Sequence, residues 1–357
     1  LARQTEVGLL VLLLVVIGFF VLQVPAASES RMYLDLMREM SPYLIASIGI
    51  TMLMIAGELD LSIGAMLALT GVVTVSVFNS TGNMWLGILM GLLTGPLIGM
   101  VNGYLVTKQG MSSLVTTLGS MFTIRGLVYV MTNKIPVTDQ NDFEAFQFLY
   151  HGETVPIPFE FYLPLPFTIP YPVPITIPFP IPITLPIVIS GEIPAIPIPT
   201  ILAVILIVIF HFILSQTEFG RQIYAIGGNQ TAAKVSGIKV GRIKFILFLI
   251  SSTLAAVSGL LITAQTSTGY FDAGVTGFEL FVIASVVLGG VSLSGGQGTL
   301  IGTVLGVFIQ GMTAKGLRFM GVQTNQQLIV TGLVMMVAVF LHDIRKRVKT
   351  LRRRLGS

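Results

Sequence analysis

Two acidic residues interrupt a stretch that is otherwise suited to a lipid environment. Glu58 and Asp60 break an apolar run that begins at Pro42 and resumes from Leu61 to Phe78. An ionised side chain at membrane depth costs about 2.5–3.5 kcal/mol on insertion scales, so it normally faces a cavity, a partner or interfacial water. The two carboxylates are therefore candidates for a polar path across a membrane or for a proton relay. A position at the membrane interface is an equally good interpretation.

Further polar residues follow in the next two apolar stretches. Asn102 lies near the end of the run 84–106 and offers both a donor and an acceptor. The run 113–131 supplies several hydroxyl groups and the charge of Arg125. For Asn102, hydrogen bonding between helices is favoured over contact with a solute. The candidates for a translocation pathway are Glu58, Asp60, Asn102, Thr116 and Thr117.

Nothing in the sequence suggests catalysis. There is no serine–histidine–acid arrangement, no pair of catalytic carboxylates and no metal-ligand cluster, and His151, His211 and His342 lie in loops or at the ends of apolar runs. The chain has no cysteine, which excludes a disulfide framework and thiolate metal sites. We expect a protein without a catalytic site, a metal ion or a cofactor of its own.

Composition places the chain in a bilayer. Of 357 residues, 53% are hydrophobic and 10% are charged, against about 25% charged in an average soluble domain. Because a span needs about 20 residues, we predict an all-α integral membrane protein, a single domain over 1–357 with about ten transmembrane helices. The expected spans are 6–24, 42–56, 61–78, 84–106, 113–131, 195–214, 243–264, 278–291, 299–313 and 327–341.

Two of the expected spans have faces of small residues. In 84–106 a glycine recurs at every fourth position, and 299–313 repeats the pattern. Such faces let helix backbones approach closely where lipid removes the hydrophobic drive for association. The two spans are five apart, so units made of spans 2–5 and 7–10 would have opposite orientations, the inverted repeat common in transporters. The helix-packing candidates are Gly91, Gly95, Gly99, Gly302 and Gly306.

The segment 133–199 is polar at first and then rich in proline, and we expect it outside the cell. Most of the chain's 18 prolines lie here, many alternating with Ile, Val or Phe. The alternation imitates a strand, but proline removes ladder donors, so polyproline II or irregular extended chain is the physical alternative.

A basic loop, 215–244, separates the apolar runs of the second half. Its excess of Lys and Arg predicts a cytoplasmic position, as does the basic tail 342–357, so both termini are expected inside, while Lys315 and Arg318 fit this topology poorly. The charge surplus of +4 is concentrated in these two segments and indicates an acidic lipid surface rather than nucleic acid. Within the loop, residues 230–235 can form one helical turn between two glycine-containing breaks. An ordinary basic connection is the simpler alternative to a docking element.

Three ordered motifs resemble the permease subunits of ABC importers for ribose, related monosaccharides and autoinducer-2. They are EFGRQIYAIGGNQTAAKVSGI at 218–238, GELDLSIGAMLAL at 57–69 and VVLGGVSLSGGQGTLIGTVLG at 286–306. The resemblance covers the chain except for roughly 145–200. It implies a bacterial inner-membrane permease for a sugar or sugar-like solute, paired with a second, identical or homologous, permease subunit. It also implies a periplasmic solute-binding protein and cytoplasmic ATP-binding cassette subunits that bind the ATP.

The resemblance makes the basic loop the coupling loop on which the ATPase subunits dock. Small residues of the one-turn helix would fit a groove on the ATPase, and glycines would permit the turns around it. The coupling residues expected on this basis are Glu218, Gly220, Arg221, Gly228, Asn229, Ala232, Ala233, Ser236 and Gly237.

The pentapeptide LSGGQ, Leu293 to Gln297, spells the signature of ABC ATPase domains, but we interpret it as a turn that closes a span. Nucleotide hydrolysis also needs a GxxxxGK[ST] loop after a strand, and the sequence contains no Gly-Lys pair. The main alternative function is an ion-coupled secondary transporter that uses Glu58, Asp60 or Arg125. It is disfavoured because the last four spans hold almost no acid except Glu279.

Overall fold

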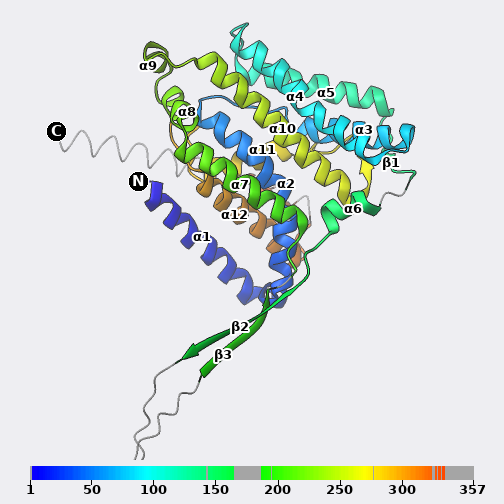
Figure 1. Cartoon of the computed structure of the whole chain (residues 1–357), viewed down its shortest axis with the longest axis vertical. Coiled ribbons are helices and arrows are strands. Elements are labelled where there is room, and N and C mark those ends of the chain that lie inside the picture. Colours follow the sequence, from blue (N-terminus) through cyan, green and yellow to red (C-terminus); the bar gives the residue numbers. More distant parts are fainter. Residues whose placement is uncertain are drawn as a thin grey trace, which may run out of the picture. The chain divides into compact units, whose positions relative to one another are not determined.

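The computed structural model describes residues 2–141, 144–164, 186–193, 195–275 and 277–323, and a few positions up to 333. This part of the chain is dominated by helices, and seven of them are long and apolar enough to cross a membrane (Figure 1). The chain is an all-α integral membrane protein. The expected span 327–341 lies largely outside the described residues, and the tail 342–357 with His342 lies wholly outside them, so ten spans remains a prediction.

Seven helices are candidate membrane spans by their length and composition, and the structure has further helices and strands besides them. The seven are α1 (Ala2–Gln23), α3 (Ile63–Thr81), α4 (Met84–Thr107), α5 (Ser113–Thr132), α7 (Ile198–Gln216), α10 (Val240–Thr266) and α12 (Leu300–Phe319). The other helices are η1 (Pro25–Ser28), α2 (Ser30–Ile55), α6 (Glu144–His151), α8 (Glu218–Gly228), α9 (Gln230–Val235) and α11 (Phe278–Leu288). The strands β1 (Val137–Thr138) and β4 (Thr268–Gly269) form a short antiparallel pair.

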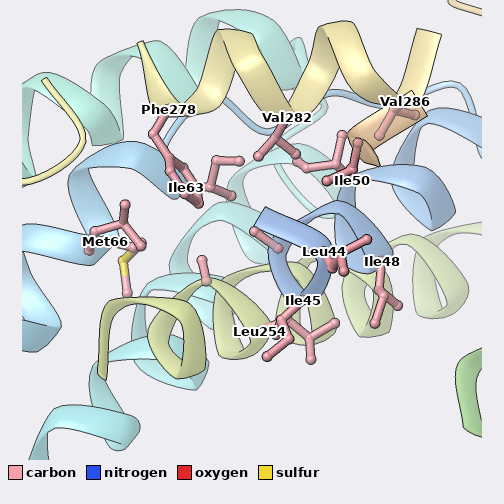
Figure 2. Close-up of a cluster of buried hydrophobic side chains, with 14 of the residues drawn as sticks. Leu44, Ile45, Ile48, Ile50, Ile63, Met66, Leu254, Phe278, Val282 and Val286 are labelled. Carbon is pink, nitrogen blue, oxygen red and sulfur yellow. The ribbon is translucent and has the colours of Figure 1, made fainter. Parts of the chain in front are cut away.

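Helix α2 is the centre of the bundle. The expected span from Pro42 is only the second half of one 26-residue helix, which begins at Ser30 and has Pro42 inside it. The Pro42 carbonyl accepts a hydrogen bond from Ser258 of α10 at 2.8 Å. Almost every residue after Met40 is buried, and Figure 2 shows these side chains between α10, at Leu254, and α11, at Val282. Burial on all sides explains why the part of this helix after Met40 carries no charged residue.

Glycines of α4 bring this helix into close contact with its neighbours, and Gly95 and Gly99 lie against backbone atoms. A Cβ at Gly95 would be 2.7 Å from Thr253 Cα, and one at Gly99 would be 2.8 Å from Leu249 Cα, both on α10. A Cβ at Gly91 would collide with Thr74 of α3. In α12, Gly302 and Gly306 meet carbonyl oxygens of Gly289 and Ser285 in the same way. No side chain fits at these contacts.

The two expected repeat units contain the same order of elements. In the first, α2 is followed by a non-helical stretch, 56–62, and then by α3 and α4. In the second, α10 is followed by the stretch after Thr266 and then by α11 and α12. The third helix of each unit packs through glycine on the helix before it: Gly91 on α3, and Gly306 on α11. The fourth span of the second unit lies largely outside the described residues, so the inverted repeat remains a prediction.

The expected span 278–291 contains only a short helix, and the stretch before it packs on α3. Helix α11 has 11 residues, so it is about 16 Å long and covers about half of a hydrocarbon core. The preceding stretch runs along α3, because Gly269 packs on Val72 and Gly274 packs on Gly64. An extended segment and a short helix therefore take the place of one span. Non-helical backbone at membrane depth is tolerated where protein covers it.

The chain divides into two compact units, and residues 153–196 are the second. Here β2 (Ile157–Pro164) and β3 (Pro186–Ile193) pair antiparallel, so the expectation of polyproline II or irregular chain is wrong for these residues. The register pairs Pro158 with Glu192 and Pro164 with Pro186, an even number of pairs apart. Since hydrogen-bonded and non-bonded pairs alternate along an antiparallel ladder, all three prolines can occupy non-bonded positions. The remaining prolines of 165–185 lie outside the described residues.

We predict that Gly99→Leu destabilises the bundle, because the new side chain would separate α4 from the α10 backbone. Overpacking of this kind typically costs about 1–3 kcal/mol. The measurement is the thermal unfolding midpoint of the detergent-purified protein. Gly119→Leu on α5 is the matched control, since no atom lies within 4 Å of its Cβ position. Equal midpoints for the wild type and Gly99→Leu would show that this face of α4 meets lipid.

Candidate functional site

The basic loop folds as two short capped helices at one end of the bundle, where α10 begins (Figure 1). The Thr217 hydroxyl accepts a hydrogen bond from the first turn of α8, and Asn229 Oδ1 accepts one from Ala232 N at 2.9 Å. These are N-caps, which satisfy amide groups that a helix start leaves free. The helical turn expected at 230–235 is α9, with the bounds predicted. Gly237, at a φ of +86°, ends it.

The outward face of α9 differs from the face expected. Ala232, Val235 and Ser236 are exposed, but Ala233 is buried and packs into the protein itself. The Ala233 side chain is therefore not part of a surface that a partner could touch. On α8, Glu218 and Arg221 are exposed, and Glu218 accepts a hydrogen bond from Gln222 in the next turn.

The structure requires glycine at Gly220, as expected, but at the end of α8 the requirement lies one residue earlier than expected. A Cβ at Gly220 would collide with the Leu214 carbonyl oxygen, so this glycine is needed at the α7–α8 corner. At Gly228, by contrast, a Cβ would meet no atom within 4 Å. Its neighbour Gly227 has no room for a side chain, because a Cβ there would collide with the Ile55 carbonyl oxygen at the end of α2.

The LSGGQ pentapeptide lies in a turn between α11 and α12 that packs on the loop. Gly296 N donates to the Ile55 carbonyl at 2.8 Å, and a Cβ at Gly296 would be 2.8 Å from Gly228 Cα. Tyr224 of α8 donates its hydroxyl proton to the Gly298 carbonyl at 2.8 Å. Burial, with the Glu6 carboxylate nearby, raises the pKa of Tyr224, which keeps the donor proton in place. The end of α2, the end of α8 and this turn thus meet backbone to backbone, a contact that sequence reasoning missed.

Lys244 connects three segments beside this contact. Its ammonium group, buried in the first turns of α10, donates to Glu58 Oε1 and, at 2.8 Å, to Gln230 Oε1 at the start of α9. Glu58 was expected in a translocation pathway, and the structure pairs it with this lysine. Sequence reasoning counted Lys244 only among the positive charges of the loop.

Asp60 and Asn102 belong to one buried hydrogen-bond network. The Asp60 carboxylate accepts bonds from the Ser62 amide at 2.9 Å and from Ser251 Oγ of α10 at 3.1 Å. Asn102 of α4 donates to Ser62 Oγ at 3.1 Å and accepts from Ser120 of α5. The network joins four helices at the break before α3. Asn102 therefore connects helices, which is the role favoured for it.

The remaining polar candidates lie apart from this network. Thr116 and Thr117 are buried, and their hydroxyls donate to carbonyl groups one turn earlier in α5. Arg125 donates to the Ala273 carbonyl, at 2.6 Å, in the extended segment before α11. Lys315, which fitted the expected topology poorly, is buried in a pair with Glu39 at 2.9 Å. Pairing explains how this cation is accommodated.

Comparison with known proteins places the chain among transport permeases. A sequence model of the family described as "Branched-chain amino acid transport system / permease component" matches residues 32–339. The ribose import permease protein RbsC of Bacillus subtilis (strain 168) is 34% identical over 331 residues, which are 91% of this chain and 90% of that protein. No solved structure matches the chain.

Two relatives from Escherichia coli (strain K12) are similar over comparable lengths. Its ribose import permease protein RbsC is 32% identical over 309 residues, 87% of this chain and 84% of that protein. Its L-arabinose transport system permease protein AraH is 29% identical over 303 residues, 84% of this chain and 79% of that protein. With a family match across most of its length and these relatives, the chain belongs to the permease component family of ABC transport systems.

Proposed function

We propose that this permease forms the translocation pathway of an importer for a sugar or sugar-like solute. The observation that carries the proposal is the similarity to ribose and L-arabinose permeases along most of both chains. The family description names branched-chain amino acids instead. Uptake of labelled ribose, L-arabinose and leucine by vesicles that contain the complete transporter tests the two classes. Uptake of leucine alone would overturn the sugar assignment.

The energy comes from partner subunits. Two ATP-binding cassette subunits dock on the loop of α8 and α9, and a second permease subunit, identical or homologous, completes the pathway. A periplasmic solute-binding protein delivers the solute. The chain lies in the bacterial inner membrane with this loop and both termini in the cytoplasm, as its basic residues favour. Rigid-body movement of the repeat units supplies alternating access.

The loop suits docking for physical reasons. Helix α9 presents a small exposed face of Ala232, Val235 and Ser236, and Val235 is 85% exposed. An exposed apolar residue on a capped, well-defined turn is what a groove on another protein can bury. Beneath that face, Ala233 and Gly227 fix the loop to the bundle.

We predict that the chain alone neither binds nor hydrolyses ATP. The LSGGQ turn lacks the phosphate-binding loop that nucleotide hydrolysis needs. Equilibrium binding of labelled ATP to the purified chain measures this. Saturable binding that Gly295→Asp removes would overturn the prediction.

We predict that Ala232→Arg and Val235→Glu abolish association with the ATPase subunit and leave membrane insertion intact. Each places a charge in a small interface, where an unpaired buried charge costs about 3–5 kcal/mol. The measurement is co-purification with the ATP-binding cassette subunit of the same transport system, together with solute uptake. Gln109→Arg, at an exposed position after α4, adds a charge outside the loop and should retain both. If both loop variants associate with the ATPase subunit as the wild type does, α8 and α9 are an ordinary connection and not a docking element.

We predict that uptake depends on ATP and persists when an uncoupler collapses the proton gradient. The Asp60 carboxylate accepts bonds from Ser62 and Ser251, a structural role that does not require proton transfer. Asp60→Asn should therefore retain uncoupler-resistant uptake. The readout is uptake into vesicles with ATP held constant inside them. Loss of wild-type uptake on addition of uncoupler would favour the ion-coupled alternative.

A further inference from the structure

Lys244 is a buried lysine that holds together parts of the chain far apart in sequence. Its side chain is 9% exposed and that of Glu58 is 11% exposed. The same ammonium group bonds Gln230, the first residue of α9. Lys244 itself stands in α10, which runs on to Ser251 two turns later. One cation therefore ties α9, α10 and the connector that follows α2.

The connector 57–62 carries this tie into the bundle. Two residues after Glu58, Asp60 bonds Ser251 of α10 and the start of α3, and through Ser62 it reaches Asn102 of α4. Leu59 N, between the two acids, donates to Ser113 Oγ of α5 at 3.3 Å. A displacement of Glu58 would consequently act on α3, α4, α5 and α10 through a few hydrogen bonds.

The second attachment of the loop is of a different kind. Gly227 and Gly228 touch the Ile55 carbonyl and Gly296 through backbone atoms alone. That contact fixes the end of α8 but does not include α9. Among the described residues, Lys244 supplies the side-chain hydrogen bond that joins α9 to the connector.

We propose that Lys244 is the positioning residue that transmits movement of α9 to the connector 57–62 and so to the helices around Asp60. Breaking a buried pair by removing one partner leaves an uncompensated charge, so the tie is not readily replaced by water. The inference rests on the proposed docking of ATPase subunits at α9. It goes beyond that proposal in assigning the transmission step to one side chain that does not face the partner.

The first experiment uses the permease alone, so it is independent of docking. Since the chain has no cysteine, a nitroxide attached to Val235→Cys labels α9 only. Lys244→Met and Glu58→Gln should each increase the mobility of the label. Lys108→Met, which removes an exposed lysine at the end of α4, should leave it unchanged. An unchanged nitroxide spectrum in both Lys244→Met and Glu58→Gln would overturn the inference.

The second experiment measures transport by the complete importer in proteoliposomes. Coupling between sites is typically worth about 5–150-fold, so Lys244→Met and Glu58→Gln should lower solute uptake per ATP hydrolysed by roughly tenfold. Both variants should still co-purify with the ATPase subunit, because α9 keeps its exposed face. The exchanged pair, Glu58→Lys with Lys244→Glu, restores the ion pair and should recover a substantial part of the uptake.

The outcomes separate the inference from the proposed function. Failure of the wild type to co-purify with the ATPase would refute the docking proposal and leave the nitroxide result standing. Normal docking with wild-type uptake per ATP in both single variants would refute the transmission role alone. If the single variants unfold in detergent, uptake by the exchanged pair, Glu58→Lys with Lys244→Glu, tests the transmission role instead. A stable exchanged pair with no recovery of uptake would also overturn the inference.

Discussion

Close contact between helix backbones is the constraint on which the rest of this structure depends. Lipid tails are as apolar as the side chains, so moving apolar side chains from lipid into a helix–helix contact gains little free energy. Helices in a membrane therefore associate through van der Waals contact and hydrogen bonds. The glycines of α4 bring it against the α10 backbone, and Gly227 brings the basic loop against the end of α2. The second contact is also a close backbone contact at a glycine, but it lies outside the spans. It places the loop where Lys244 can reach both Glu58 and Gln230.

The breaks between helices are the second consequence of a membrane environment. Backbone groups that leave a helix at membrane depth need partners. Here the stretch after α2 is satisfied by Ser113, by Gly296 and by the Asp60 carboxylate. The stretch before α11 receives the Arg125 side chain on the Ala273 carbonyl. Asp60, one of the residues that first indicated a transport path, and Arg125 thus stabilise the places where the chain departs from plain helix.

Local patterns predicted the elements well where one physical signal was sufficient. The apolar runs became α1, α3, α4, α5, α7, α10 and α12, and the glycine breaks around 230–235 predicted α9. Periodicity could not show that Pro42 stays within a helix, because proline in a helix interior usually kinks or breaks the helix. Nor could it show that residues 269–274 lie along α3 or that Ala233 faces inward. These features depend on tertiary contacts, as do the pairing of Lys244 and the strands of the proline-rich segment.

The glycine contacts also limit how this sequence can change over time. At Gly95 and Gly227 the opposing atoms belong to the backbone of another segment, so no replacement on the far side can make room for a new methyl group. Where Gly316 of α12 meets the Phe20 ring of α1, a smaller residue at position 20 could compensate. A substitution at a backbone contact therefore cannot be compensated by a change in the opposing residue. A substitution at a peripheral contact such as Gly316 can be compensated by a second substitution in the opposing side chain. The central helices and the loop junction should accordingly accept fewer routes of divergence than the outer helix α1.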